Sequence, residues 1–394
     1  MSFNSTPSAE RVHIGFFGLR NAGKSSVVNA VTAQELSLVS DVKGTTTDPV
    51  RKAMELLPIG PVVIIDTPGT DDEGALGEQR VKRAMKTLDE TDIAVLVIDA
   101  EKGETQADEE LKKLITERKI PLITVYNKAD LLSAVPTAGE NTLYVSAASG
   151  TNIFELKEML GRIAADGKKE KRLIGDLLQK DDIVVLVTPI DESAPKGRMI
   201  LPQQQTIRDV LDSDAVCLVT KETQLETLLS SLPKKPRLVV TDSQAFGFVN
   251  KVVPKDIPLT SFSMLFARYK GDLFALADGA DTLDKLRDGD RVLISEGCTH
   301  HRQCNDIGTV KLPNWVSKYT GKNLVFDFTS GRDFPEDVSE YSLVIHCGGC
   351  MLNDAEISSR AKRAKAQGVP MTNYGTAIAK MHGILERAIK PLKK

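Results

Sequence analysis

Short apolar runs alternate with amphipathic stretches along the whole chain. In the first third, five apolar runs have the length of strands, and the stretches between them place apolar residues at helical spacing. This alternation predicts a mostly parallel sheet with helices on both faces. The expected strands are His13–Phe17, Val62–Asp66, Ile93–Asp99, Pro121–Asn127 and Thr142–Ser146, and the expected helices are Ser25–Thr32, Glu78–Leu88, Thr105–Glu117 and Asn152–Ala164.

The same pattern restarts twice after a charged stretch, residues 166–172, which is typical of a linker. In the second region we expect strands Ile183–Val187, Ala215–Thr220, Arg237–Thr241 and Leu259–Phe262 and helices Gln203–Leu211 and Gln224–Leu232. In the third we expect strands Arg291–Ser295, Leu324–Asp327, Ser342–Ile345 and Pro370–Asn373 and helices Ala355–Gln367 and Thr376–Ile389. We therefore predict an α/β protein of three α/β domains, covering residues 1–170, 171–265 and 266–394.

Bulk composition narrows the classes of protein. The 394 residues suit two or three domains, and a net charge of −3 gives little attraction for nucleic acid or for an anionic membrane. No apolar run approaches the roughly 20 residues of a membrane span, and the first eleven residues lack the apolar stretch of a signal peptide. We expect a cytoplasmic protein without nucleic-acid or membrane partners, in which clustered cysteines bind metal or do redox chemistry.

A phosphate-binding loop lies near the start of the chain. The segment Gly18-Leu-Arg-Asn-Ala-Gly23-Lys24-Ser25 follows a predicted strand and opens a predicted helix, the context that this motif requires. The helix start offers unpaired N–H groups and a positive dipole end to phosphate. Lys24 would neutralise charge on the β- and γ-phosphates, and Ser25 would bind Mg²⁺.

Two further segments can complete the phosphate site. Asp66-Thr-Pro-Gly69 ends a predicted strand, so that Asp66 can hold Mg²⁺ through a water molecule and Gly69 can donate its N–H to the γ-phosphate. The loop of residues 44–48 lies between the phosphate loop and Asp66. It is a candidate switch segment in which Thr46 is the preferred Mg²⁺ ligand and Thr45 the second choice.

The base is read at the ends of two later strands. In Asn127-Lys128-Ala-Asp130, Asp130 can accept two hydrogen bonds from guanine that adenine cannot donate, and we expect it to be a buried acceptor. Ser146-Ala147 can touch the guanine O6 through a backbone N–H. Lys24, Thr46 and Gly69 are the candidate catalytic residues. The candidate GTP-binding residues are Gly18, Asn21, Ala22, Gly23, Lys24, Ser25, Ser26, Asp66, Gly69, Asn127, Lys128, Asp130, Ser146 and Ala147.

Over residues 11–165 these motifs together resemble the translation-factor-type GTPases, in particular the branch of tRNA-modifying and ribosome-assembly GTPases. Thr70 follows Gly69 where Ras-like proteins carry the glutamine that positions water, so slow intrinsic GTP hydrolysis is expected. In this branch an asparagine at the position of Asn21 helps to hold a potassium ion. The resemblance therefore implies that K⁺ adds positive charge in the transition state.

Cysteines and histidines gather in a second, C-terminal window. Four of the five cysteines and three of the five histidines fall in it: Cys298, His300, His301, Cys304, His346, Cys347 and Cys350. Cys347-Gly-Gly-Cys350 lets two sulfurs bind one metal centre, and Cys298 can supply a third. A zinc site of three cysteines and a histidine and an iron–sulfur cluster with an exchangeable fourth ligand both fit this spacing. The fifth cysteine, Cys217, is expected to be a buried apolar thiol.

The set Cys298-Thr-His300, a gap of about 45 residues and His346-Cys347-Gly-Gly-Cys350 is similar to the signature of HydF, the GTPase family that matures FeFe-hydrogenase. The resemblance implies a GTPase domain, a dimerisation domain and a cluster domain, with a 4Fe–4S cluster on Cys298, Cys347 and Cys350. His300 and His346 are then candidate cluster ligands.

The same resemblance implies a homodimer or larger oligomer that carries the di-iron precursor of the hydrogenase active site. Its partners would be apo FeFe-hydrogenase and the two radical-SAM maturases that build the precursor. The alternative is an RNA- or ribosome-associated GTPase whose C-terminal domain is held together by structural zinc.

Overall fold

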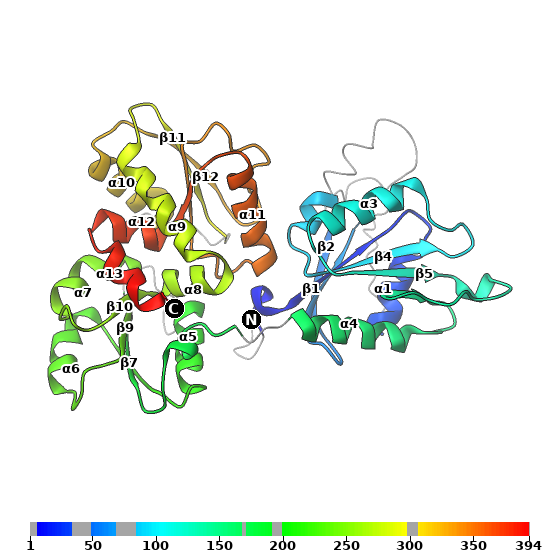
Figure 1. The fold of residues 1–394 in the computed structure, drawn as a ribbon, viewed down its shortest axis with the longest axis horizontal. Coiled ribbons are helices and arrows are strands. Elements are labelled where there is room, and N and C mark those ends of the chain that lie inside the picture. Colours follow the sequence, from blue (N-terminus) through cyan, green and yellow to red (C-terminus); the bar gives the residue numbers. More distant parts are fainter. Residues whose placement is uncertain are drawn as a thin grey trace. The chain divides into compact units, whose positions relative to one another are not determined.

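In the computed structural model the chain divides into two compact units, residues 1–169 and 170–394. The structure describes residues 6–33, 49–67, 84–167, 171–190, 199–297 and 306–393. Both units are built from strands and helices of the α/β type (Figure 1). Within the described residues no helix combines the length and the apolar character that crossing a membrane requires.

The first unit contains a six-stranded sheet in the order β2-β3-β1-β4-β5-β6. All neighbouring strands are parallel except β2, which pairs antiparallel with β3. The mostly parallel sheet is thus confirmed, whereas β2 was not predicted. Six of its seven residues are partly or fully exposed and it carries three charged side chains, so it shows no apolar run. The strands are β1 (Val12–Phe17), β2 (Val50–Leu56), β3 (Gly60–Asp66), β4 (Ile93–Asp99), β5 (Leu122–Asn127) and β6 (Thr142–Tyr144).

Helices cover both faces of this sheet. Helices α1 (Lys24–Thr32) and α4 (Ile153–Gly167) contribute to the hydrophobic cluster on one face, and α3 (Gln106–Glu117) contributes to the cluster on the other. Thr105 caps α3 through a capping box with Asp108, which fixes the start of that helix. Residues 84–88 are helical, and the rest of the expected helix Glu78–Leu88 lies outside the described residues.

The second unit contains two four-stranded sheets, in the orders β10-β9-β7-β8 and β12-β11-β13-β14. Every neighbouring pair in both sheets is parallel. All eight strands lie where the apolar runs predicted them. Their bounds are β7 (Ile183–Val187), β8 (Val216–Thr220), β9 (Leu238–Thr241), β10 (Leu259–Ser261), β11 (Arg291–Ser295), β12 (Val325–Thr329), β13 (Leu343–His346) and β14 (Met371–Asn373).

The helices of the second unit depart further from expectation. Helices α7 to α10 were not predicted, and the single helix expected over Thr376–Ile389 is wrong. Two helices, α12 and α13, occupy that stretch because Gly383 takes a left-handed conformation, with φ 67°, between them. The helices are α5 (Leu201–Leu211), α6 (Leu225–Ser231), α7 (Phe246–Val252), α8 (Phe262–Lys270), α9 (Leu273–Ala280), α10 (Leu312–Thr320), α11 (Asp354–Ala366), α12 (Tyr374–Met381) and α13 (Leu385–Ile389).

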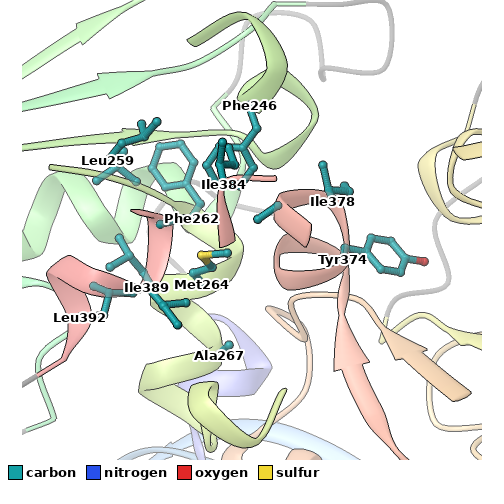
Figure 2. Packing of buried hydrophobic residues seen from close by; sticks show 14 of the residues in the cluster. Phe246, Leu259, Phe262, Met264, Ala267, Tyr374, Ile378, Ile384, Ile389 and Leu392 are labelled. Atoms are coloured by element: carbon teal, nitrogen blue, oxygen red, sulfur yellow. The ribbon is translucent and has the colours of Figure 1, made fainter. Parts of the chain in front are cut away.

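One large hydrophobic cluster joins the two sheets of the second unit. Figure 2 shows Phe262 and Met264 of α8 packed among Phe246, Ile384 and Ile389, which come from α7 and from the C-terminal end of the chain. Helix α8 is therefore anchored on several sides. The domain boundary expected between residues 265 and 266 falls within α8, and the division into three domains stays a prediction.

Candidate functional site

The phosphate loop connects β1 to α1 and is held from behind by Asn127. The Asn127 Nδ2 donates to Ala22 O at 3.0 Å and to Gly23 O at 3.5 Å, while Asn127 Oδ1 accepts from Ala147 N at 3.1 Å. Asn127 thus joins the phosphate loop to the loop after β6. A Cβ added to Gly23 would lie 2.2 Å from Asn127 Nδ2, so the close approach of the two segments requires glycine there.

A buried lysine and a buried carboxylate meet at the start of α1. Lys24 Nζ lies 3.6 Å from Asp66 Oδ1, and Ser25 Oγ donates to Asp66 Oδ2 at 3.5 Å. Burial lowers the pKa of Lys24 and raises that of Asp66, and in each case the opposite charge of the partner works against the shift. Asp66 Oδ1 is buried and has no hydrogen-bond partner among the described residues. This unsatisfied oxygen, with Ser25 beside it, fits a hydrated Mg²⁺ with phosphate.

The base end of the site differs from expectation in two respects. Asp130 lies in the short turn after β5 and is exposed, so the prediction of a buried acceptor is wrong for the protein alone. The Ser146 N–H donates to Thr151 O at 3.1 Å, and the Ala147 N–H is used by Asn127. A contact of either N–H with guanine O6 would have to replace these bonds, and it stays a prediction.

The other predicted nucleotide residues that the structure describes lie at the carboxyl ends of the strands, or in the first turn of α1. Gly18 and Asn21 lie in the loop after β1, Ser26 lies in the first turn of α1, and Asn21 and Ser26 are exposed. Lys128 Nζ donates to Asp99 Oδ2 at 2.6 Å at the end of β4. Thr45, Thr46 and Gly69 lie outside the described residues.

The cysteine loop, residues 347–352, begins where β13 ends. Cys347 Sγ accepts hydrogen bonds from Gly297 N at 3.0 Å and from Gly349 N at 3.3 Å. Burial raises the pKa of Cys347 to about 11, and these two N–H groups oppose the shift. Burial also raises the pKa of Cys350, against the nearby positive charge of Lys270. Backbone N–H groups aimed at a buried sulfur are what a metal-bound thiolate requires.

The carboxyl end of β11, the strand that pairs with β13, is close to the cysteine loop. Gly297 follows β11, which pairs with β13, so the contact of Gly297 N with Cys347 Sγ joins the carboxyl ends of two neighbouring strands. Gly297 directly precedes Cys298 in the sequence. Cys298, His300, His301 and Cys304 lie outside the described residues. The described residues contain no group of three His, Cys, Asp or Glu placed to hold a metal, and a third ligand would come from beyond them.

His346 is engaged by the protein itself. Arg360 Nη1 donates to His346 Nε2 at 2.9 Å, and His346 Nδ1 donates to Cys347 O at 2.7 Å. Burial, together with the Arg360 charge, lowers the pKa of His346 to about 3, so the ring is neutral. Both ring nitrogens are therefore occupied. His346 could become a cluster ligand only if it lost the Arg360 contact, and its role as a ligand stays a prediction.

Three buried residues around the cysteine loop were missed from the sequence. Glu296 accepts a hydrogen bond from Tyr374 Oη at 3.2 Å and lies beside Cys347, whose pKa its charge raises. Arg360 supports His346, and Lys270 reaches the loop from α8. The sequence marks Glu296 only by its place two residues before Cys298, and Arg360 only by its (i, i+4) spacing from Glu356.

Cys217, on β8, is partly buried against the core, and burial raises its pKa to about 11.

Family models match most of the chain. Residues 13–128 match a model described as 50S ribosome-binding GTPase. Residues 173–271 match the hydrogen maturase F dimerization domain, and residues 273–391 match the hydrogen maturase F tetramerization domain. The two latter models meet at the junction between α8 and α9.

Known relatives match the first unit. The chain is 34% identical over 160 residues to the tRNA modification GTPase MnmE of Nitrosomonas europaea, covering 39% of this chain and 35% of that protein. It is 31% identical over 179 residues to GTPase Der of Kosmotoga olearia, covering 41% of this chain and 40% of that protein. The chain thus spans between a third and two fifths of the length of these curated relatives.

A crystal structure of Era from Aquifex aeolicus bound to GDP and AlF4⁻ is also similar, with 19% identity and a TM-score of 0.33, over 53% of this chain and 93% of that one. The family model and the sequence relatives together identify the first unit as a GTPase domain homologous to those of MnmE and Der.

Proposed function

Because the chain belongs to the hydrogen maturase F (HydF) family, we propose that it is a GTP-hydrolysing scaffold that carries a 4Fe–4S cluster and delivers the di-iron precursor of the FeFe-hydrogenase active site. The observation that carries this proposal is the contact between Gly297 N and the Cys347 sulfur. It places the residue before Cys298 at the cysteine loop, so that three thiols can serve one cluster.

Three cysteines would hold the cluster. Cys347 and Cys350 come from the loop after β13, and Cys298 follows Gly297 at the end of β11. The residues fit the group, because soft thiolates that accept N–H bonds suit iron–sulfur centres. When bound, such a cluster supplies an iron whose fourth ligand can exchange. The engagement of His346 by Arg360 supports a fourth position that is open to exchange, and His300 stays a candidate for it.

The first unit would supply the nucleotide chemistry. Lys24, Ser25 and Asp66 would hold Mg²⁺ and the phosphates, and Asp130 would read guanine. Asn21 would help to place K⁺. Thr46 and Gly69 would contact Mg²⁺ and the γ-phosphate, so that hydrolysis changes the loops that carry them.

The dimerization and tetramerization models identify a homo-oligomer. Each sheet of the second unit ends in an edge strand with exposed apolar side chains. These are Val216 and Val219 on β8, both 45% exposed, and Val325 and Phe328 on β12, 48% and 37% exposed. Open apolar edges are natural pairing surfaces. We therefore propose these edges as contacts between copies, with residues 1–170 binding GTP, 171–265 forming the dimer and 266–394 holding the cluster.

The alternative, an RNA- or ribosome-associated GTPase with structural zinc, has less support. It explains the likeness of residues 13–128 to ribosome-associated GTPases, but it leaves the two hydrogen maturase F models over the second unit without a reason.

The carrier role is tested by activation of hydrogenase. The chain isolated anaerobically from cells that also express both radical-SAM maturases should activate apo FeFe-hydrogenase, measured as hydrogen evolution. The chain isolated from cells that lack the maturases should not. If iron-loaded protein from the first preparation leaves the hydrogenase inactive, the carrier role is wrong.

A further inference from the structure

Lys270 is the last residue of α8, and it is only 6% exposed. Its Nζ donates to Gly349 O at 3.0 Å and to Leu352 O at 2.5 Å, and it lies 3.5 Å from Cys350 O. An ammonium has three N–H donors. The Lys270 side chain therefore contacts three carbonyl groups of the cysteine loop. This loop also carries the thiols of Cys347 and Cys350.

Hydrogen bonding these carbonyls with an ammonium group requires the burial of a positive charge, which loses its hydration free energy. Burying an ammonium costs several kcal/mol unless its surroundings replace the lost water. Here the replacement comes from the three carbonyls, the C-terminal dipole end of α8 and the ring of Phe266, whose centre lies 5.8 Å from Nζ. A neutral amide could satisfy part of the loop at a lower desolvation cost. The charge itself is therefore the property to explain.

The positive charge of Lys270 would stabilise the thiolate forms of the cysteines in this loop. When Cys347 and Cys350 bind a metal centre, the loop gains negative charge in a buried setting, and a fixed cation beside it lowers the energy of that state. Lys270 is fixed because α8 is fixed. Figure 2 shows Phe262, Met264 and Ala267 of this helix inside the packed cluster, and Leu265 is also fully buried.

The contact also joins two matched domains. Lys270 lies within residues 173–271, matched by the dimerization model, whereas the cysteine loop lies within residues 273–391, matched by the tetramerization model. Lys270 therefore contributes a charge from the region matched by one model to a loop in the region matched by the other.

We propose that Lys270 is a positioning residue for the cluster: it fixes the backbone of the cysteine loop and holds one positive charge beside its thiolates. The proposal rests on the proposed function, since it needs a cluster on this loop. A fixed cation near a cluster stabilises the reduced, more negative state, so the reduction potential is higher than with a neutral residue. It also slows the loss of iron.

Three variants separate the hydrogen bonds from the charge. Lys270→Met removes both, Lys270→Gln keeps a donor without the charge, and Lys270→Arg keeps the charge. The matched control is Lys380→Met. It removes a lysine near the end of α12 whose Nζ pairs with Asp281 at 2.7 Å and with Asp284 at 2.8 Å. Each full-length protein is reconstituted anaerobically with iron and sulfide. Iron loss to a chelator and the reduction potential, titrated with dithionite under electron paramagnetic resonance, are then measured.

We expect the Met variant to lose iron about tenfold faster than the wild type, the low end of the effect of outer-shell residues on metal affinity. Its potential should shift to more negative values. The Gln variant should retain iron better than the Met variant but show the same direction of shift in potential. The Arg variant and Lys380→Met should match the wild-type potential.

Circular dichroism and GTP hydrolysis report whether each variant is folded. If the Met variant does not fold, the Gln and Arg variants decide the question. An unchanged potential in folded Lys270→Gln, or an equal shift in Lys270→Arg, overturns the proposal. A wild-type chain that takes up no cluster would instead overturn the proposed function, so the two failures are distinguishable.

Discussion

The phosphate loop and the cysteine loop differ in whether the polar side chains around them are exposed or buried. In the phosphate loop, Asn21, Ser25 and Ser26 are exposed and Lys24 is the buried charge. The first backbone N–H groups of α1 have no partners within the helix and would be available to phosphate. Around the cysteine loop, Lys270, Arg360 and Glu296 are all buried. Lys270 donates to carbonyls of the loop, and Arg360 donates to His346, the residue directly before it.

This difference suits the lifetime of each ligand. A helix start offers donors that the main chain leaves unpaired in any case, so a nucleotide can arrive and leave without reordering the interior. Thiolates in a protein interior need fixed charges and N–H groups around them, because burial alone disfavours their ionised form. We infer that the first loop exchanges its ligand and the second retains its metal.

The sharpest way to separate the two regions is to remove one thiol. Cys347→Ser should abolish cluster assembly and leave GTP hydrolysis unchanged, since the serine oxygen is a poor ligand for iron and the nucleotide residues lie in the other unit. Iron content after anaerobic reconstitution and phosphate release measure the two effects. Cys217→Ser, on the edge strand β8, is the control and should keep the full iron content. A full complement of iron in Cys347→Ser would show that the ligand assignment is wrong.

The converse change acts on the nucleotide alone. Asp130→Asn should weaken GTP binding by about two orders of magnitude, because two hydrogen bonds to a charged acceptor are worth roughly 3 kcal/mol or more together. The affinity for ATP should be unaffected, so the preference for guanine falls. Titration with fluorescent GTP and ATP analogues measures both affinities. Glu140→Gln changes another exposed carboxylate in the same unit and should have no effect. Guanine selectivity equal to that of the wild type would exclude Asp130 from base recognition.

A glycine pair tests whether the phosphate loop depends on close packing. Gly23→Ala forces a Cβ against Asn127 Nδ2, whereas Gly103→Ala has open space around it. Both glycines have positive φ, 82° and 72°, so each substitution carries about 1 kcal/mol of backbone strain. We expect only Gly23→Ala to lose nucleotide affinity, by about tenfold or more. Calorimetric titration with GTP and thermal unfolding of both variants provide the comparison. Equal losses in both variants would mean that Asn127 does not constrain the loop.

The smallest effect concerns the monovalent ion. GTP hydrolysis should be several-fold faster in KCl than in NaCl at equal ionic strength, because K⁺ would add positive charge beside the phosphates. Asn21→Ala should remove this difference without changing the rate in NaCl. Phosphate release in the two salts measures the difference, and equal rates for the wild type would show that K⁺ takes no part in hydrolysis.

Features formed by a contiguous stretch of residues could be predicted from the sequence, whereas features formed by packing between distant segments could not. Apart from β2, the strands of the three sheets are apolar runs, and the phosphate loop is one contiguous segment, so both were predicted. Helix α8 was missed because six of its nine residues are buried, which hides any helical period, and because it follows β10 directly. Strand β2 was missed for the opposite reason, since its charged residues are those of an exposed edge.

The supports of the cysteine loop could not have been predicted in the same way. Lys270 reaches the loop, and Arg360 reaches His346 beside it, only through the packing of separate segments, and no motif joins them. The exposure of Asp130 likewise depends on how the turn after β5 lies on the fold. Sequence motifs therefore gave the candidate ligand-binding groups, whereas the structure added the groups that hold those candidates in place.

We propose that the thiols at the strand ends of the second unit hold an iron–sulfur cluster. This assignment is tested by measuring iron, acid-labile sulfide and zinc per chain, together with the absorption spectrum of anaerobically purified and reconstituted protein. We expect a brown protein with about four iron and four sulfide per chain and broad absorption near ~400 nm. A colourless protein that holds a single zinc ion and takes up no iron would show that the assignment is wrong.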